Sequence, residues 1–297
     1  MRMRVGILLL AVSGCTAGAA AQGEFDGEAA LQYVAEQMEF GPRVPGSEGH
    51  RRTGDWILAQ LRARADTAEV QEFTHVTADG KLLELRNFIG RFRPELPDRI
   101  LYVAHWDTRP KADRSANLGQ QQMPVPGAND GGSGVAVLLG VADALQATPP
   151  DVGVDLLFVD GEDYGTFTPQ RDVLLGSTHY AATLDPAALP LLAVVWDIVG
   201  DRDLRICREG NSEAGAPEVV DRVWNRADEL GYGRVFRRDQ ATVVTDDHIP
   251  LQEVGVRAIV VIQCPLPAYW HTTEDTLDKI SAASLGIVGN VAVALLR

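Results

Sequence analysis

The chain has 297 residues and a mass of 32.1 kDa, which corresponds to one large domain or two small ones. Its 45% hydrophobic and 23% charged residues are typical of a soluble globular protein and exclude disorder, collagen-like repeats and a multi-span membrane protein. The 27 Lys and Arg against 41 Asp and Glu give a net charge of −14, which repels phosphate backbones and argues against nucleic acid as a partner. Three cysteines are too few for a disulfide framework, so we expect any metal to be held by His and carboxylates.

The N-terminal residues have the layout of an export signal. Arg2 and Arg4 precede an apolar run at residues 5–12, and Ser-Gly-Cys follows, ending at Cys15. The run is too short to span a bilayer as a helix. The pattern resembles a bacterial lipoprotein signal at residues 1–15, which predicts a periplasmic, membrane-anchored protein with a lipidated Cys15. The alternative is cleavage near residues 19–21, which would leave a soluble periplasmic or secreted protein.

A short tether and one domain are expected after the signal. Residues 16–27 are rich in Ala and Gly, whereas residues 28–297 alternate helix and strand signals with no internal repeat and no break in composition. Apolar side chains at helical spacing predict two N-terminal helices, around residues 31–38 and 56–61. Residues 70–76 and 82–92 alternate apolar and polar side chains, as half-exposed strands do. Cys207 and Cys264 could pair in an oxidising compartment, but the sequence does not show whether they meet.

Four continuous apolar runs are typical of strands that are buried on both faces. They lie at residues 100–104, 156–159, 193–196 and 258–262. Helical stretches are predicted at residues 135–145, 219–230 and 285–296. This alternation predicts a single α/β domain with a largely parallel central sheet.

Ionisable residues follow the first three of these buried strands. His105 follows the first, Asp160-Gly161-Glu162-Asp163 the second and Asp197 the third. Because the carboxyl ends of parallel strands converge on one crevice, we expect these side chains to lie together. Any one of them is readily explained as a turn residue, but three in series favour a site in which a cation or a proton offsets the carboxylate charges.

Two further segments supply residues of the same kinds. The glycine-rich turn at residues 127–134 contains Asp130 and lacks the preceding strand and the Lys-Ser/Thr of a phosphate loop. Residues 267–275 place His271 directly after Trp270. The resulting set, which has no thiolate, suits zinc, and Glu162 lies beside a ligand position as a general base would. The set is His105, Asp130, Asp163, Asp197 and His271.

These motifs resemble those of the zinc aminopeptidase family that includes the glutaminyl cyclases. The resemblance covers residues 40–297 and rests on His105-Trp106-Asp107, the turn around Asp130, the Glu162 segment and Trp270-His271-Thr272. It implies a three-layer α/β/α domain with a largely parallel, mixed sheet. The segment Asp-Asp-His-Ile-Pro at residues 246–250 and the Trp before the ligand His favour the cyclase branch. One departure is Val260, where the animal enzymes carry a His.

The resemblance implies that N-terminal Gln of peptides or proteins is cyclised to pyroglutamate with release of ammonia. One zinc would be held by Asp130, Asp163 and His271, and Glu162 would carry the proton. Asp197 and Asp246 would support that relay. The substrate would contact Trp270, His248 and Trp106. The expected partners are peptides or proteins that begin with Gln, a membrane is contacted only through the lipid anchor, and the expected state is a monomer.

Two alternatives remain open at this stage. A two-zinc aminopeptidase would use His105 and Asp197 as further ligands and Glu162 to activate water. A non-catalytic binding protein with this fold is disfavoured, because every expected ligand position is filled.

Overall fold

The computed structural model describes residues 25–297, apart from the side chains of residues 239–242. The predicted signal at residues 1–15, including Cys15, and most of the tether lie outside the described residues. Asp26 caps the first helix, α1 (Gly27–Glu39), and Phe25 is buried against α3 and α8, so the folded domain starts slightly before residue 28. In the described part of the chain, no helix is both long and apolar enough to cross a membrane.

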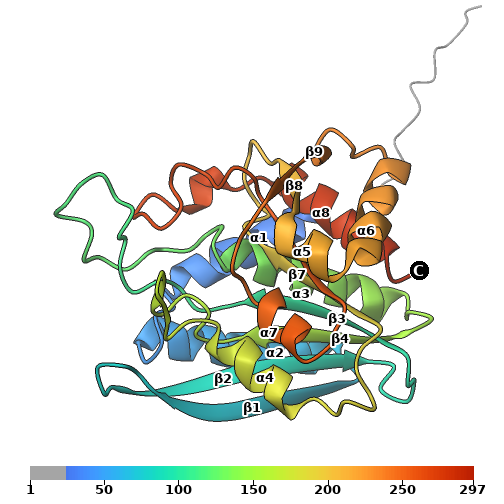
Figure 1. The fold of residues 1–297 in the computed structure, drawn as a ribbon, viewed down its shortest axis with the longest axis horizontal. Helices are drawn as coiled ribbons and strands as arrows, with labels where there is room; N and C mark the ends of the chain where they lie inside the picture. Colours follow the sequence, from blue (N-terminus) through green and yellow to red (C-terminus); the bar gives the residue numbers. More distant parts are fainter. Residues whose placement is uncertain (1–24) are drawn as a thin grey trace, which may run out of the picture.

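A six-stranded mixed sheet forms the centre of the molecule, in the order β1-β2-β4-β3-β7-β10 (Figure 1). Strands β4, β3, β7 and β10 are mutually parallel, whereas β1 and β2 form an antiparallel hairpin that pairs with β4. This confirms the predicted α/β class. The bounds are β1 Thr67–Val76, β2 Leu82–Phe92, β3 Arg99–His105, β4 Gly153–Val159, β7 Leu192–Asp197 and β10 Ala258–Ile262.

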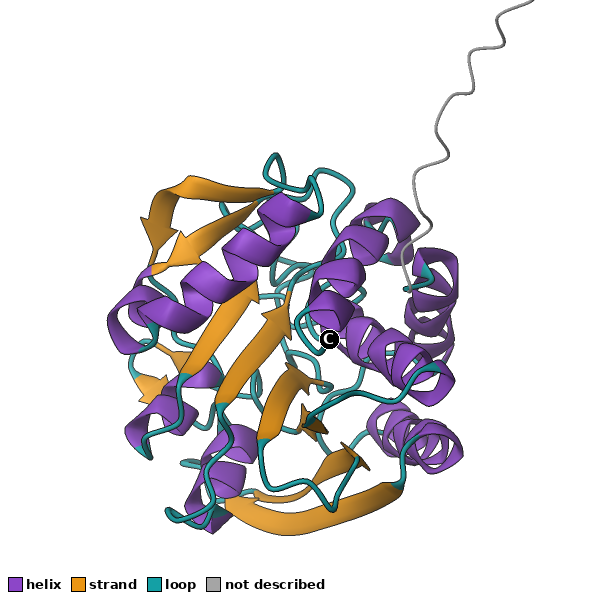
Figure 2. Ribbon diagram, turned by 90° about the vertical axis from the view of Figure 1, so that its right-hand side faces the viewer, coloured by secondary structure: helices purple, strands orange, loops and turns teal. Residues whose placement is uncertain are grey.

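Helices cover both faces of this sheet (Figure 2). Successive side chains of a buried strand point to opposite sides, so each strand contributes to two cores. In β3, Ile100 and Tyr102 pack in a core with α1, α2, α3, α6 and α8, whereas Leu101 and Val103 pack in a second core with α4 and α7. The helices predicted from apolar spacing are confirmed. The helix bounds are α2 Glu48–Arg64, α3 Gly132–Ala147, α4 Leu175–Thr183, α5 Gly210–Gly215, α6 Pro217–Glu229, α7 His248–Glu253, α8 Ala282–Ala294 and the 3₁₀ turn η1 Leu277–Lys279.

The start of α3 lies directly against the carboxyl end of β7. A Cβ atom at Gly134 would overlap the carbonyl oxygen of Trp196, so only glycine permits this approach. Gly131 has a φ of 79°, a left-handed conformation that starts the helix immediately after Asp130. The glycine-rich turn therefore brings Asp130 to the sheet edge where the parallel strands end.

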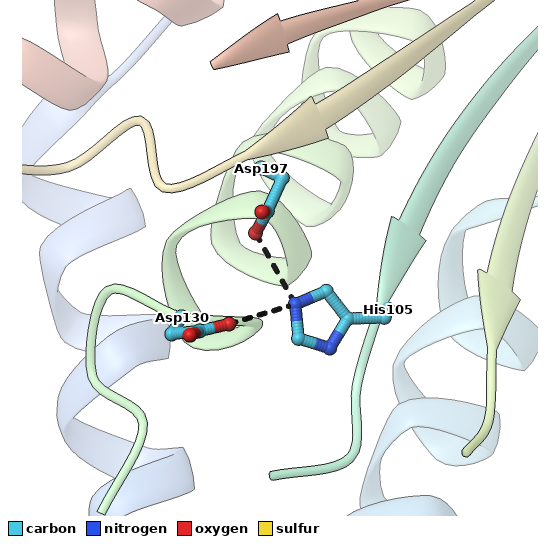
Figure 3. Close-up of side chains that lie close together, drawn as sticks. All are labelled: His105, Asp130 and Asp197. Atoms are coloured by element: carbon cyan, nitrogen blue, oxygen red, sulfur yellow. Dashed lines mark hydrogen bonds and ion pairs between the residues drawn. The ribbon is translucent and has the colours of Figure 1, made fainter. Parts of the chain in front are cut away.

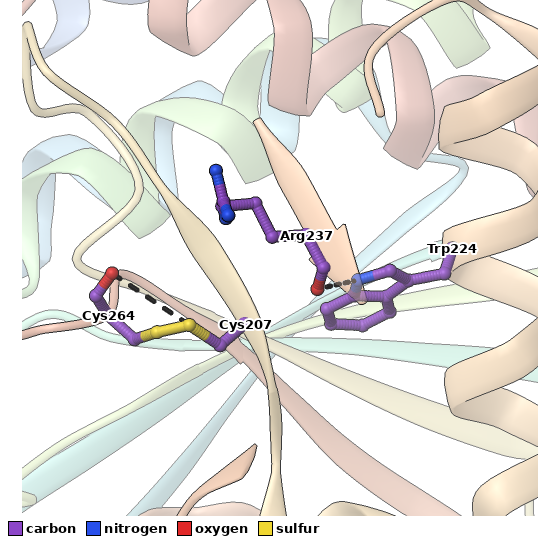
Figure 4. Close-up of a disulfide and its surroundings, with 4 residues drawn as sticks. All are labelled: Cys207, Trp224, Arg237 and Cys264. Carbon is purple, nitrogen blue, oxygen red and sulfur yellow. Dashed lines mark hydrogen bonds between the residues drawn. A yellow bond between two sulfur atoms is a disulfide. The ribbon is translucent and has the colours of Figure 1, made fainter. Parts of the chain in front are cut away.

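A disulfide joins Cys207 to Cys264, a pairing that the sequence left open (Figure 4). Cys207 lies in β8 (Ile206–Glu209), which pairs in parallel with β9 (Phe236–Thr242) in a small second sheet. Cys264 lies just after β10 and starts the segment that leads to His271. The disulfide therefore ties that segment to β8. A further two-stranded sheet consists of β5 (Thr166–Phe167) and β6 (Gln170–Arg171).

Candidate active site

The predicted ligand residues meet at the carboxyl edge of the parallel strands. His105 ends β3, Asp197 ends β7, Asp163 lies in the turn after β4, and Asp130 and His271 come from the loops before α3 and after β10. All five are buried. Four of them, all but His105, line a pocket of about 330 Å³ that also exposes apolar side chains. The pocket is lined by Arg114, Asp130, Glu162, Asp163, Phe167, Thr168, Asp197, Ile198, Val243, Val244, Thr245, Asp246, Ile262, Leu266, Trp270 and His271.

The first candidate metal centre consists of Asp130, Asp163 and His271. The Nε2 atom of His271 lies 3.4 Å from Asp130 Oδ2 and 3.2 Å from Asp163 Oδ2. Both oxygens are buried, and neither has a hydrogen-bond partner among the described residues. An unpartnered buried carboxylate oxygen is costly, and a cation between these atoms would remove the cost. One imidazole and two carboxylates are a suitable ligand set for zinc, so these residues fit the predicted metal.

A second candidate centre shares Asp130 and adds His105 and Asp197 (Figure 3). The Nε2 atom of His105 lies 3.1 Å from Asp130 Oδ1 and makes a 3.2 Å hydrogen bond with Asp197 Oδ1. This group has the donor types of a metal site as well. It differs from the first in that its imidazole is already hydrogen-bonded to one of its carboxylates.

Two further buried carboxylates hold the turns that carry the ligand residues. Asp107 accepts hydrogen bonds from the backbone N–H groups of Glu162 and Asp163, at 3.0 and 3.2 Å. Asp275 accepts from those of Asn129 and Asp130, at 2.8 and 3.0 Å. Both residues lie within the sequence motifs of the site, but no role was predicted for either. An Asp that binds a distant turn cannot be distinguished from a local turn residue before the two segments are known to meet.

Arg109 was also missed. Its guanidinium donates a 2.6 Å hydrogen bond to Asp163 Oδ1 and pairs at 2.7 Å with Asp113. It therefore fixes the Asp163 carboxylate through one oxygen and leaves Oδ2 facing His271. The only signal in the sequence is its place four residues after His105 in the same loop.

The loop after β10 brings Trp270 and His271 to the pocket. Their rings are stacked with centroids 3.7 Å apart. His271 has a φ of 56°, and Ile198, directly after Asp197, has a φ of 49°. Positive φ is uncommon for residues other than glycine and is rarest for a β-branched residue. Both unusual backbone states therefore lie at this site, where such conformations tend to gather.

Two residues that were predicted to contact the substrate do not line the pocket. Trp106 is fully buried, stacks on His50 with ring centroids 4.3 Å apart, and donates a hydrogen bond to the Arg86 carbonyl oxygen. Because it directly follows His105, it points to the opposite side of the chain. His248 is also fully buried, with its Nε2 atom 3.4 Å from Glu209 Oε2. Both side chains are therefore enclosed by protein outside the pocket lining.

Two carboxyl groups of the pocket, Glu162 and Asp246, hold their protons more tightly than usual. Burial raises the pKa of Glu162 well above its ordinary value, and Asp163 adds to the effect. Burial, together with the charge of Asp197, raises the pKa of Asp246 to about 7. Asp130 shows the reverse. Burial alone would raise its pKa, but the neighbouring imidazoles of His105 and His271 outweigh burial and lower it. The site thus combines an ionised ligand carboxylate, Asp130, with a carboxyl group, Asp246, that exchanges its proton near neutral pH.

Residues 87–296 match the family described as peptidase family M28. A solved glutaminyl cyclase from Bacteroides thetaiotaomicron is 34% identical, with 92% of this chain and 97% of that chain covered and a TM-score of 0.88. A structure described as a leucine aminopeptidase precursor from Bacteroides thetaiotaomicron VPI-5482 is also 34% identical, with 94% and 99% covered and a TM-score of 0.88. Bovine glutaminyl-peptide cyclotransferase is 25% identical, with 95% of this chain and 90% of that protein covered. The chain therefore belongs to peptidase family M28.

Proposed function

We propose that the protein is a glutaminyl-peptide cyclotransferase, which converts N-terminal Gln to pyroglutamate and releases ammonia. The observation that carries this proposal is Asp246, which lies in the pocket together with Glu162 and Asp197. A hydrolase needs one carboxylate to activate water. Three buried carboxyl groups instead suit a substrate whose amine must lose a proton while its amide nitrogen gains one.

Asp130, Asp163 and His271 would hold one zinc ion. When bound, zinc would supply Lewis-acid polarisation of the side-chain amide carbonyl. The support for this placement is the pair of unpartnered Oδ2 atoms, which face the His271 Nε2 atom.

Glu162 would move the proton during ring closure. The α-amine nitrogen of Gln attacks its own side-chain Cδ, so an N–C bond forms and the bond from Cδ to the amide nitrogen breaks. Glu162 takes the proton from the amine and delivers it to the leaving nitrogen, which departs as ammonia. Its raised pKa supports this role, because a higher pKa makes the carboxylate a stronger base toward the amine proton. Asp197 and Asp246 would support the relay by accepting hydrogen bonds.

The pocket walls would fold the Gln side chain back toward its own amine. Trp270, Leu266 and Ile262 line the pocket and offer an apolar surface to the methylene groups. Because the nucleophile belongs to the substrate, holding this near-attack geometry supplies much of the acceleration.

The second candidate function is that of a two-zinc aminopeptidase. It is favoured by the second triad, because Asp130 could bridge two metal ions with His105 and Asp197 completing the second site. The similarity of the chain to the structure described as a leucine aminopeptidase precursor also supports this candidate.

We also propose that the protein is exported and lipidated at Cys15. The disulfide between Cys207 and Cys264 supports export, because such bonds persist in oxidising compartments. Mass spectrometry of the native N-terminus should show an acylated Cys15. A mature chain that begins at Gln22 would refute lipidation.

Incubating the enzyme with one peptide that begins with Gln and one that begins with Leu tests the activity. Ammonia and a pyroglutamyl peptide are expected from the first, with no free leucine from the second. Free leucine without ammonia would refute the cyclase and favour the aminopeptidase. The variant Glu162→Gln is the control for contaminating activity, because it should abolish whichever reaction the pocket performs.

A further inference from the structure

The rim of the pocket carries one cationic side chain whose role the proposed reaction does not explain. Arg114 lies in the loop between β3 and α3, which projects from the body of the molecule in Figure 1. Its guanidinium carbon lies 5.0 Å from the centroid of the Trp270 ring. Among the described residues, none accepts a hydrogen bond from this guanidinium, and no other Lys or Arg lines the pocket.

The backbone around Arg114 is fixed to the site. Its N–H group donates a 3.2 Å hydrogen bond to the carbonyl oxygen of His271. The preceding residue, Asp113, is paired with Arg109, which in turn bonds Asp163. The guanidinium is therefore held at the pocket mouth by a loop that is anchored to two of the candidate metal ligands. Its free donors face solvent, since the side chain is exposed.

The charges around the pocket determine which substrate groups the Arg114 guanidinium can bind. Five carboxyl groups line the pocket, namely Asp130, Glu162, Asp163, Asp197 and Asp246, and the whole chain carries a net charge of −14. Such a field attracts the positively charged amine of a peptide and repels an acidic residue that follows it. Arg114 locally reverses this field where the substrate chain leaves the pocket. A guanidinium presents several donors in a fixed plane, which matches the geometry of a carboxylate.

We propose that Arg114 forms a subsite for the second residue of the substrate and favours a carboxylate side chain there. This inference rests on the proposed function and names its substrate class, which is peptides that begin with Gln-Glu or Gln-Asp. Trp270 forms the boundary between the two subsites, with the Gln side chain in the pocket and Arg114 over its outer edge. Arg114 does not contact the reacting atoms, so its effect falls on KM rather than on kcat.

The test compares two peptides, Gln-Glu-Ala and Gln-Ala-Ala, on the zinc-loaded full-length enzyme. The wild type should prefer the Glu peptide in kcat/KM by about three- to tenfold, the range of a partly exposed ion pair. Arg114→Gln should remove this preference through KM, whereas Arg114→Lys should keep part of it. The control is Arg62→Gln, which removes an exposed positive charge from α2, away from the pocket. The preference of the wild type should also weaken as salt is added, because an exposed ion pair is screened.

The two proposals fail in different ways. If ammonia is released from both peptides and Arg114→Gln leaves their ratio unchanged, the subsite is refuted while the cyclase stands. An equal loss of preference in Arg62→Gln would likewise refute the subsite, because the effect would then come from net charge. If no peptide yields ammonia and free leucine is formed from Leu peptides, the cyclase is refuted. In that case the subsite is tested by the ratio of kcat/KM for Leu-Glu-Ala to that for Leu-Ala-Ala. An unchanged ratio in Arg114→Gln would again refute the subsite.

Discussion

The two triads that share Asp130 contain the same kinds of side chain but differ in how their atoms are satisfied. In the first, Asp130 Oδ2 and Asp163 Oδ2 lie near His271 Nε2 without a hydrogen bond. In the second, His105 Nε2 is hydrogen-bonded to Asp197 and lies close to Asp130 Oδ1. The first arrangement leaves lone pairs directed at a common point, whereas the second uses the imidazole to link its own carboxylates.

The contacts that hold the two triads in place also differ. Arg109 holds the remaining oxygen of Asp163, and Asp107 accepts a hydrogen bond from its backbone N–H group, so the first triad is pre-organised before any ion binds. The second triad borders Asp246, a further carboxyl whose pKa is raised to about 7 by burial and by Asp197. We infer from this contrast that the first triad is the zinc site and that the second serves the substrate's protons. The two triads have the same kinds of ligand atom, so the assignment rests on the hydrogen bonds around each triad.

The largest effect is expected from a matched pair of alanine substitutions. Asp163→Ala removes a ligand of the first triad, so bound zinc should be lost and activity should fall by at least about a thousandfold. Asp197→Ala removes the equivalent carboxylate of the second triad and should keep zinc at wild-type stoichiometry. Elemental analysis of both purified variants checks this. Loss of zinc in Asp197→Ala with retention in Asp163→Ala would reverse the assignment of the two triads.

A large effect without metal loss is expected at Glu162. Glu162→Gln keeps the shape of the side chain and removes its ability to accept a proton, so kcat should fall by about a hundredfold or more. Zinc should remain bound, because Glu162 belongs to neither triad. Steady-state kinetics and metal content measured on the same preparation separate the two effects. A variant with full activity would place the proton transfer elsewhere.

Arg109 should affect zinc affinity through its hydrogen bond to Asp163, without binding the metal itself. Arg109→Gln releases the Asp163 carboxylate, and the loss of such an outer contact typically weakens metal affinity by about 10- to 100-fold. Competition with a chelator measures the change. Arg114→Gln in the same loop is the control and should bind zinc as the wild type does, because its guanidinium contacts neither triad carboxylate. Unchanged affinity in Arg109→Gln would show that the first triad is not pre-organised by this contact.

The smallest effect concerns Asp246 and the pH dependence of the free energy of unfolding. The pKa of Asp246 is about 7 when folded and close to 4 when unfolded, so the folded state binds the proton more tightly. Its contribution to stability is present below about pH 4 and is lost as the pH rises through 7. In the presence of a chelator, the unfolding free energy of the wild type should therefore drop by about 2 kcal/mol more than that of Asp246→Asn between pH 5 and pH 8. Urea unfolding at both pH values measures this, and parallel curves for the two proteins would contradict it.

The sequence predicted the strands and the site residues for one shared reason. Continuous apolar runs mark buried parallel strands, and polar residues directly after them must lie at one edge of the sheet. His105, Asp163 and Asp197 were therefore placed together correctly from their positions alone. Short elements such as α5 and β8 escaped prediction because they contain too few residues to establish a period.

The scaffold of the site could not be predicted in this way. Arg109, Asp107 and Asp275 act across long separations along the chain, and no local pattern distinguishes them from surface or turn residues. Trp106 illustrates the opposite error. It adjoins His105 in sequence, yet strand geometry points neighbouring side chains to opposite sides, and the ring packs in the core. Nearness to a site residue along the chain is therefore a poor guide to contact with the substrate.

The position of the metal tests the central claim most directly. Crystals of the zinc-loaded enzyme, measured at the zinc absorption edge, should show one anomalous peak per chain, between Asp130, Asp163 and His271. His105 should then remain hydrogen-bonded to Asp197. A second peak of similar height between His105, Asp130 and Asp197 would contradict the account and support the two-zinc aminopeptidase.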